Sequence, residues 1–163
     1  MKNKIEISAG GIVCKESPSQ GSGFRDQPLL WLITQHSQFG HWSFPKGLVG
    51  DEIANESIEH AALREVGEEG GIKAKIIKKL PLVKYKYQWE DCLIDKTVHY
   101  YLMEYLSGDP TDHDWEVSEA KFVSSDEVLK ILTHDNDKQA FTKAKELLLK
   151  AMQSKRDKAR LFT

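Results

Sequence analysis

The chain has 163 residues, of which 40% are hydrophobic and 29% are charged, which suits one globular domain and argues against wholesale disorder. Its formal net charge of −2 provides no bulk positive field, so we expect neither a nucleic acid nor an anionic membrane as a partner. No apolar run reaches the ~18 residues of a membrane span, and no signal-peptide core follows Met1, which favours a cytoplasmic location.

The first part of the chain predicts two strands joined by a long surface loop. Residues 5–13 are typical of a strand, and the small or absent side chains of Ala9-Gly10-Gly11 would let another backbone approach closely. Residues 16–28 carry serine, glycine and proline at the density of a surface loop. Residues 29–34 form a short apolar run, which we place at the centre of a sheet.

Three helices and four more strands are predicted after this point. The pattern over residues 56–69 is helical and stops at Gly70-Gly71, as helices with a glycine C-cap do. Ser124 and Glu127 have the spacing of a capping box that begins a second helix, and the last helix is expected over residues 138–152. The strands are residues 76–83, 85–89, 97–106 and 120–123. We expect the first two of these strands to form one hairpin.

This order of elements predicts an α/β fold in which helices cover a central sheet. We assign residues 1–153 to this single domain. The basic tail, residues 154–163, is expected to be frayed, as the ends of chains commonly are. A monomer and a homodimer both remain compatible with the sequence.

The first predicted helix carries three acids in an unfavourable place. On a wheel at about 100° per residue, one arc is apolar: Ile58, Ala62, Leu63 and Val66. Glu65, Glu68 and Glu69 occupy an adjoining arc about 100° wide, beside the face that packs on the sheet. Like charges four residues apart cost a few tenths of a kcal/mol, and the helix dipole disfavours each anion here by about 0.3–1 kcal/mol. Mg²⁺ or Mn²⁺ would offset this repulsion, because hard ions prefer carboxylates; a solvated acidic patch is the alternative.

The spacing of these acids resembles a known family motif. The stretch reads Gly50-x5-Glu56-x7-Arg64-Glu65-Val66-x-Glu68-Glu69-x-Gly71-Ile72. Every specified position agrees with the Nudix box, so the chain is similar to Nudix hydrolases. Three further stretches carry the resemblance, which covers residues 5–132: Ala9-Gly10-Gly11, Phe44-Pro45-Lys46-Gly47 and Lys96-Thr97-Val98-His99-Tyr100. Among these enzymes the chain looks most like the asymmetrical diadenosine tetraphosphate hydrolases.

The resemblance implies an α/β/α sandwich with a mixed central sheet. It also implies that Glu65, Glu68 and Glu69 hold Mg²⁺ or Mn²⁺, and that a main-chain carbonyl at Gly47 completes the coordination. Arg64 would hold a carboxylate of the preceding loop in an ion pair, and Glu56 would be a stabilising or auxiliary acid.

One part of the motif departs from the family pattern. Gly47 lies three residues farther from Arg64 than the corresponding glycine of most relatives. Either the loop carries three extra residues around Gly50-Asp51-Glu52, or Gly50 alone takes the place of that glycine.

Other candidate site residues lie outside the helix. The general base of the family is either a box glutamate, here Glu69, or a later loop acid, here Glu116 with Glu119 as its competitor. Lys46 would contact a phosphate oxygen as a point charge, unless it is a solvated loop lysine. Tyr85 and Tyr87 alternate on one strand and would stack a nucleobase, unless they only pack on the sheet. The two cysteines and six histidines show no ligand spacing, and none is assigned to a site.

The resemblance therefore implies hydrolysis of a diphosphate linkage in a small nucleotide. A dinucleoside polyphosphate such as diadenosine tetraphosphate is the leading substrate, and a nucleoside triphosphate pyrophosphatase of the housecleaning type is the second reading. A catalytically silent Nudix module that binds a nucleotide or a protein is a third, of another class. Such modules typically lose box acids, whereas Glu65, Glu68 and Glu69 are all present here.

Overall fold

The structure, a computed structural model, describes residues 1–17 and 28–161, with side chains as far as residue 156. Most of the loop expected at residues 16–28 lies outside the described residues. Within the described part, eight strands form one sheet. They are β1 (Lys2–Glu16), β2 (Leu29–His36), β3 (Trp42–Ser43), β4 (Lys46–Leu48), β5 (Ile72–Lys79), β6 (Val83–Trp89), β7 (Cys92–Gly108) and β8 (Val117–Ser124).

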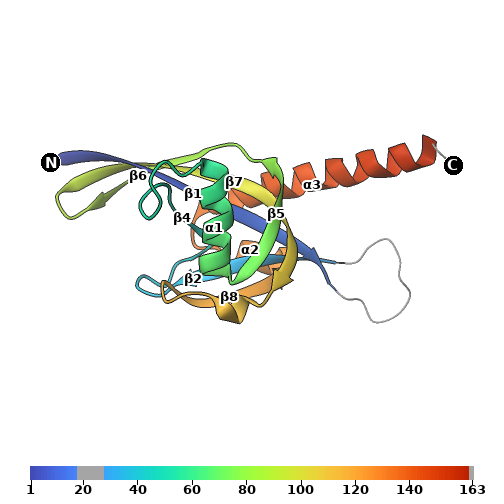
Figure 1. Cartoon of the computed structure of the whole chain (residues 1–163), viewed down its shortest axis with the longest axis horizontal. Coiled ribbons are helices and arrows are strands. Elements are labelled where there is room, and N and C mark those ends of the chain that lie inside the picture. Colours follow the sequence, from blue (N-terminus) through green and yellow to red (C-terminus); the bar gives the residue numbers. More distant parts are fainter. Residues whose placement is uncertain (18–27, 162–163) are drawn as a thin grey trace.

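The sheet is mixed and has the two longest strands at its centre. β1 and β7 run parallel, from the pair of Lys2 with Cys92 to the pair of Cys14 with Glu104. The other strand pairs described are antiparallel. The order is β3-β2-β1-β7-β5, while β4 pairs with β1, β6 with β7 and β8 with β2 (Figure 1).

Helices cover both faces of this sheet. α1 (Ile58–Gly70) lies on one face, while α2 (Ser125–Ile131) and α3 (Asp135–Leu161) lie on the other (Figure 1). One core forms under α1, where Val66 packs with Leu32 and Met103. The other forms under α2 and α3, where the rings of Trp31 and Phe141 meet edge to face at 4.9 Å between centroids. The expected α/β/α sandwich with a mixed central sheet is confirmed.

Local sequence signals position the ends of α1 and α2 as predicted. Gly71 follows α1 in the left-handed region at φ +70°, where a glycine carries no Cβ penalty. The capping box of Ser124 and Glu127 at the start of α2 is present, with both reciprocal bonds formed. The close approach expected at Gly10 is also confirmed, because a Cβ there would overlap the carbonyl oxygen of Pro45. This contact brings the turn before β4 against β1.

Two predictions about the elements are wrong. β5 and β6 do not form a hairpin with each other; both pair with β7, β6 along 92–98 and β5 along 101–108. A strand of 17 residues is long enough for both, and Pro81 interrupts the chain between them. The last helix is longer than the expected 138–152, because it begins at Asp135 and reaches Leu161. Residues 154–161 are mostly good helix formers. Fraying of the tail stays a prediction.

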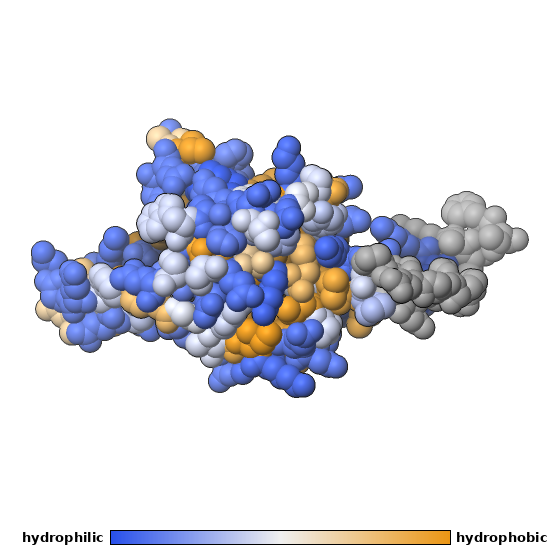
Figure 2. All heavy atoms as spheres, turned by 90° about the horizontal axis from the view of Figure 1, so that it is seen from below, coloured by the Kyte–Doolittle hydropathy of each residue, from blue (hydrophilic) through white to orange (hydrophobic). Residues whose placement is uncertain are grey.

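Most of the surface in view in Figure 2 is hydrophilic, as the share of charged residues in the chain leads one to expect. On the face shown in Figure 2, hydrophilic residues surround one apolar area over the body of the domain. Among the described residues, no helix is both long enough and apolar enough to cross a membrane.

Candidate active site

A cleft of about 800 Å³ collects nearly every residue that the sequence singled out. One wall is acidic and comes from α1, the loop before it and the segment before β8. Other lining residues come from β4, β6, β7 and the turn after β2, and include aromatic rings and lysines. Of the predicted site residues, those that line the cleft are Lys46, Gly47, Glu65, Glu68, Glu69, Tyr85, Tyr87 and Glu116.

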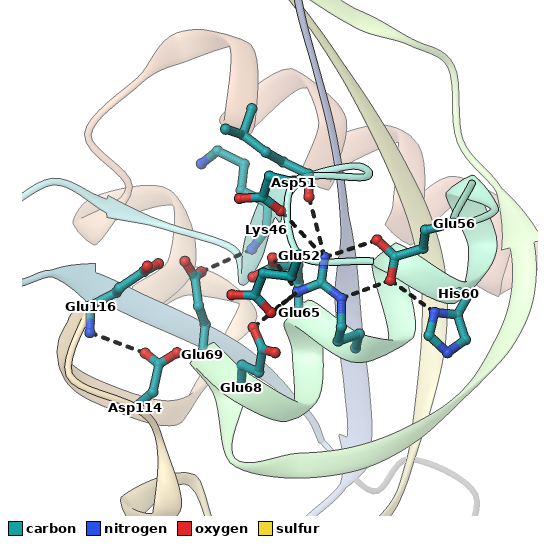
Figure 3. A network of polar contacts seen from close by, with 12 residues as sticks. Lys46, Asp51, Glu52, Glu56, His60, Glu65, Glu68, Glu69, Asp114 and Glu116 are labelled. Carbon is teal, nitrogen blue, oxygen red and sulfur yellow. Dashed lines mark hydrogen bonds and ion pairs between the residues drawn. The ribbon is translucent and has the colours of Figure 1, made fainter. Parts of the chain in front are cut away.

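The three acids of α1 face the cleft from the edge of the buried side of the helix, as the wheel predicted. Glu65 and Glu69 are buried, with only 6% and 8% of their surface exposed, whereas the side chain of Glu68 is 35% exposed. Val66, between them, is fully buried under the sheet. Because the helix is anchored through that apolar side, its neighbouring carboxylates point toward β4 (Figure 3).

Arg64 connects the carboxylates of the acidic wall through hydrogen bonds. Its Nε and Nη2 donate to the two carboxylate oxygens of Glu56 at 2.7 and 3.0 Å, a bidentate pair. Its Nη1 donates to Glu65 at 2.8 Å and to Glu68 at 3.0 Å (Figure 3). The ion pair expected with a loop carboxylate is thus formed by Glu56, and the hydrogen bonds from Arg64 lower the pKa of Glu56 to about 2. A further bond to the carbonyl of Leu48 at 3.2 Å ties the end of β4 to α1.

The turn into β4 lies directly on two of the helix acids. The backbone N–H of Lys46 donates to Oε2 of Glu69 at 2.9 Å. A Cβ on Gly47 would overlap the carboxylate of Glu65, so only glycine fits between β1 and α1 here. Gly47 therefore takes the glycine position beside the acids, and the extra residues extend the following loop. Gly50 turns that loop at φ +80°, with its N–H 3.4 Å from Oε1 of Glu56.

This arrangement disfavours the ionised forms of the buried carboxylates. Burial, with the charge of Glu69, raises the pKa of Glu65 to about 8. Burial also raises the pKa of Glu69 to about 7, and the nearby charges of Glu116 and Asp114 add to the rise. A cation between these groups would stabilise their charged forms, because an opposite charge favours ionisation.

The donor set suits a divalent metal ion, although it is not assembled around one. Within the described residues, no three carboxylate, imidazole or thiolate side chains are already arranged as a metal site. The reason is that Arg64 holds Glu65 and Glu68, while the amide of Lys46 holds Glu69. The enclosed carboxylates, with the backbone of Gly47 directly beside the carboxylate of Glu65, fit a hard cation with oxygen ligands.

Of the two loop acids, only Glu116 lies in the cleft. Its segment is fixed to the end of α1 by a bond from the N–H of Asp114 to the carbonyl of Glu68 at 2.8 Å. Burial and the charge of Asp114 raise the pKa of Glu116. Glu119 does not line the cleft; its half-exposed side chain pairs with Lys121 at 3.4 Å. The geometry therefore favours Glu116 over Glu119.

The side chain of Lys46 lines the cleft and is held there by polar side chains. Its Nζ donates to Oγ of Ser43 at 2.7 Å, and Ser43 donates in turn to buried Asp137 at 2.8 Å. Lys96, which sequence reasoning placed only in a family-like strand entry, also lines the cleft. Its Nζ lies 3.4 Å from Oε2 of Glu6, and burial lowers its pKa.

Tyr85 and Tyr87 share one face of β6, as their alternation predicted. Their ring centroids are 6.0 Å apart and both rings are half-buried. The hydroxyl of Tyr87 donates to Glu6 at 3.0 Å, and Tyr85 packs against the core under α3. Each ring therefore has a structural partner as well as a place in the cleft.

Sequence reasoning missed one group of cleft residues entirely. His36, Phe39, His41, Trp89 and His134 all line it, although the histidines were assigned no role. The histidines belong to segments that meet only in the folded chain, so ligand spacing could not reveal them. The one available signal was Trp89, which shares the alternation of the two tyrosines on β6.

Comparison with known proteins agrees with this geometry. A family model described as the NUDIX domain matches residues 11–144. The chain belongs to the Nudix hydrolase family. A curated relative named "Putative mutator protein MutT4", from Mycobacterium tuberculosis (strain CDC 1551 / Oshkosh), is 34% identical over 150 residues. That match covers 91% of this chain but only 58% of the length of the relative.

Solved structures of Nudix proteins share the fold. The binary complex of a Caenorhabditis elegans Ap4A hydrolase superposes with a TM-score of 0.71 at 21% identity, covering 88% of this chain and 98% of that one. The NUDIX domain of Shewanella oneidensis NrtR, complexed with ADP ribose, superposes with a TM-score of 0.65 at 23% identity, covering 88% of each chain. At these identities the likeness concerns the fold, and the family prediction made from the box is confirmed by the family model.

Proposed function

We propose that this protein hydrolyses the P–O–P linkage of a dinucleoside polyphosphate such as diadenosine tetraphosphate. The observation that carries the proposal is a single cleft lined by the box acids together with aromatic rings and lysines. A volume of about 800 Å³ is large for a ligand site, which suits a substrate bigger than one nucleotide. The fold shared with a C. elegans Ap4A hydrolase supports the same choice.

Glu65, Glu68 and Glu69, with the main-chain carbonyl of Gly47, are the groups that would hold Mg²⁺ or Mn²⁺. When bound, such an ion neutralises phosphate oxygens and lowers the pKa of a bound water. To hold such an ion, Glu65 and Glu68 would have to give up their bonds with Arg64. Arg64 keeps its bidentate pair with Glu56 and so continues to hold the loop against α1.

The remaining roles belong to residues around the acids. Lys46 binds a phosphate oxygen, supported from below by Ser43. Glu116 takes the proton of the attacking water, because it lines the cleft and its raised pKa makes it a better base near neutral pH. Glu69 is the alternative base, but its Oε2 already accepts the amide of Lys46. Tyr85 and Tyr87 form the side of the cleft against which a nucleoside packs.

Product analysis by chromatography tests this proposal. With Mg²⁺ or Mn²⁺, diadenosine tetraphosphate should give two unequal nucleotides. Glu68→Gln and Glu69→Gln should abolish turnover, whereas Glu59→Gln, on the exposed side of the same helix, should retain it. Full activity in both site variants would refute the assignment of the acids.

A nucleoside triphosphate pyrophosphatase is the second candidate, and the relative named a mutator protein is the observation in its favour. The same assay separates the two, because release of inorganic pyrophosphate from mononucleotides, with dinucleotides untouched, would replace the first proposal by this one. A silent binding module would turn over no pyrophosphate substrate at all.

A further inference from the structure

The cleft is also lined by five rings from three separate segments, which we call the ring cluster: His36, Phe39, His41, Trp89 and His134. Phe39 is at its centre. Its ring stacks with that of His36 at 5.2 Å between centroids and meets Trp89 edge to face at 5.7 Å. His41 lies 5.9 Å from Phe39 and joins the cluster to His134 at 4.9 Å. The cluster thus connects the turn after β2, the tip of β6 and the start of α3.

The two large apolar rings of this cluster are not buried. Phe39 is 49% exposed and Trp89 is 47% exposed, although both belong to the lining of a cleft. Tyr85 and Tyr87, which also line the cleft, are half-buried and have partners within the protein. Half-exposed aromatic faces inside a cleft offer the apolar contact that a flat ligand group would cover.

Trp89 lies on the same strand as Tyr85 and Tyr87, so its distance from them follows from the geometry of β6. Tyr85 and Trp89 share a face and are four residues apart, which is about 13 Å along a strand. Lysines Lys46, Lys86 and Lys96 line the same cleft. The cleft therefore has two aromatic positions together with cationic groups suited to phosphates.

We propose that Phe39 and Trp89 bind the second nucleobase of a two-base ligand, with the base stacked on one of the two nearly perpendicular rings and against the edge of the other. This inference rests on the proposed function and specifies its substrate as a molecule with a base at each end of a polyphosphate chain. Base–aromatic stacking depends on a flat ring and not on hydrogen-bond readout, so the position accepts different bases. The imidazole of His36 stacks on Phe39, and that of His41 lies tilted beside it, so both hold the Phe39 ring in place.

The test compares two substrates that differ only in the second nucleoside, diadenosine tetraphosphate and adenosine 5′-tetraphosphate. Trp89→Leu and Phe39→Leu should each lower kcat/KM for the two-base substrate by about 5- to 150-fold, the range of one base stack. The same variants should leave the one-base substrate within about twofold of wild type. Trp89→Phe and Phe39→Tyr, which keep a flat ring, should restore the two-base activity.

A matched control separates stacking from general damage. Leu106→Ala changes an exposed apolar residue outside the cleft and should leave both substrates unaffected. Equal losses with both substrates in the leucine variants would mean that the pair only holds the tip of β6, and would overturn the inference. No loss with the two-base substrate would overturn it as well.

Failure of the proposed function gives a different pattern. If the wild-type protein hydrolyses neither tetraphosphate, calorimetric titration with the two intact compounds still tests whether the ring cluster binds a nucleobase. Tighter binding of diadenosine tetraphosphate, lost in Trp89→Leu, supports the base site without hydrolysis. Equal affinity for both compounds, or no binding of either, overturns the base site too.

Discussion

Replacing Glu69 by glutamine should stabilise the metal-free protein at pH 8 while it abolishes catalysis. The carboxylate of Glu69 is 8% exposed and lies near the charges of Glu116 and Asp114, so its ionised form is disfavoured in the folded chain. Glutamine has the same shape without the charge, and its amide oxygen still accepts the bond from the N–H of Lys46. The gain therefore reports the cost of the buried charge alone.

The magnitude follows from the pKa of Glu69. Its rise from 4.5 to about 7 corresponds to about 3 kcal/mol, at about 1.4 kcal/mol per pKa unit. Because the pKa is higher in the folded state, the folded state binds more protons, and stability falls as the pH rises from about 4.5 to about 7. We expect Glu69→Gln to remove this fall and to gain about 1–3 kcal/mol at pH 8 but little at pH 4.5.

Urea denaturation in EDTA at both pH values measures this difference. Glu59→Gln is the control, because its exposed charge on the same helix should change stability by less than about 1 kcal/mol at either pH. Excess Mn²⁺ should stabilise the wild type more than Glu69→Gln, since a ligand of the folded state shifts unfolding by mass action. A loss of stability in Glu69→Gln at pH 8, or an equal change at both pH values, would refute the reasoning.

Four further outcomes are expected. Arg64→Ala should destabilise the protein by about 2–4 kcal/mol at pH 7 in chemical denaturation, because the enclosed carboxylate of Glu56 loses its bidentate partner and keeps only its contacts with His60 and the N–H of Gly50. A loss under about 1 kcal/mol would contradict the central role of Arg64. In the wild type, the lowered pKa of Glu56 adds stability above pH 4.5, and this stability is lost as Glu56 is protonated between pH 4.5 and about 2. Glu56→Gln should not show this loss. Identical acid denaturation curves for the two proteins would contradict this. Gly47→Ala should weaken Mn²⁺ binding in calorimetry at least about tenfold, because its Cβ displaces the carboxylate of Glu65; unchanged affinity would remove Gly47 from the site. Lys46→Met should raise KM for a tetraphosphate substrate about tenfold or more through the lost charge, and an unchanged KM would assign this lysine to the solvated loop.

The parts of the site that lie on one element followed directly from the sequence. The spacing of Glu65, Glu68 and Glu69 translates into geometry because a helix has a constant pitch, and the apolar arc orients it toward the sheet. The resemblance to the family box predicted an ion pair of Arg64 with a carboxylate of the preceding loop, but it did not say that Glu56 is the partner. The two alternatives for Gly47 and Gly50 could be separated only in three dimensions, where Gly47 meets Glu65.

What could not be predicted depends on contacts between distant segments. Phe39 and Trp89 are 50 residues apart and meet only because β6 pairs along the first half of β7. The expected hairpin of β5 and β6 was wrong for a related reason, since local alternation says that a strand exists but not which strand it pairs with. Lys96 was recognised in its strand, and its place in the cleft became visible only with Glu6 beside it.

Diffraction from crystals soaked in Mn²⁺ tests the central claim most directly, because anomalous scattering locates the ion independently of activity. We predict an anomalous peak bounded by Glu65, Glu68 and Glu69 and next to the carbonyl of Gly47, with Arg64 bonded to Glu56. A crystal saturated with Mn²⁺ in which these carboxylates still bond to Arg64 and Lys46, with no peak between them, would contradict the account.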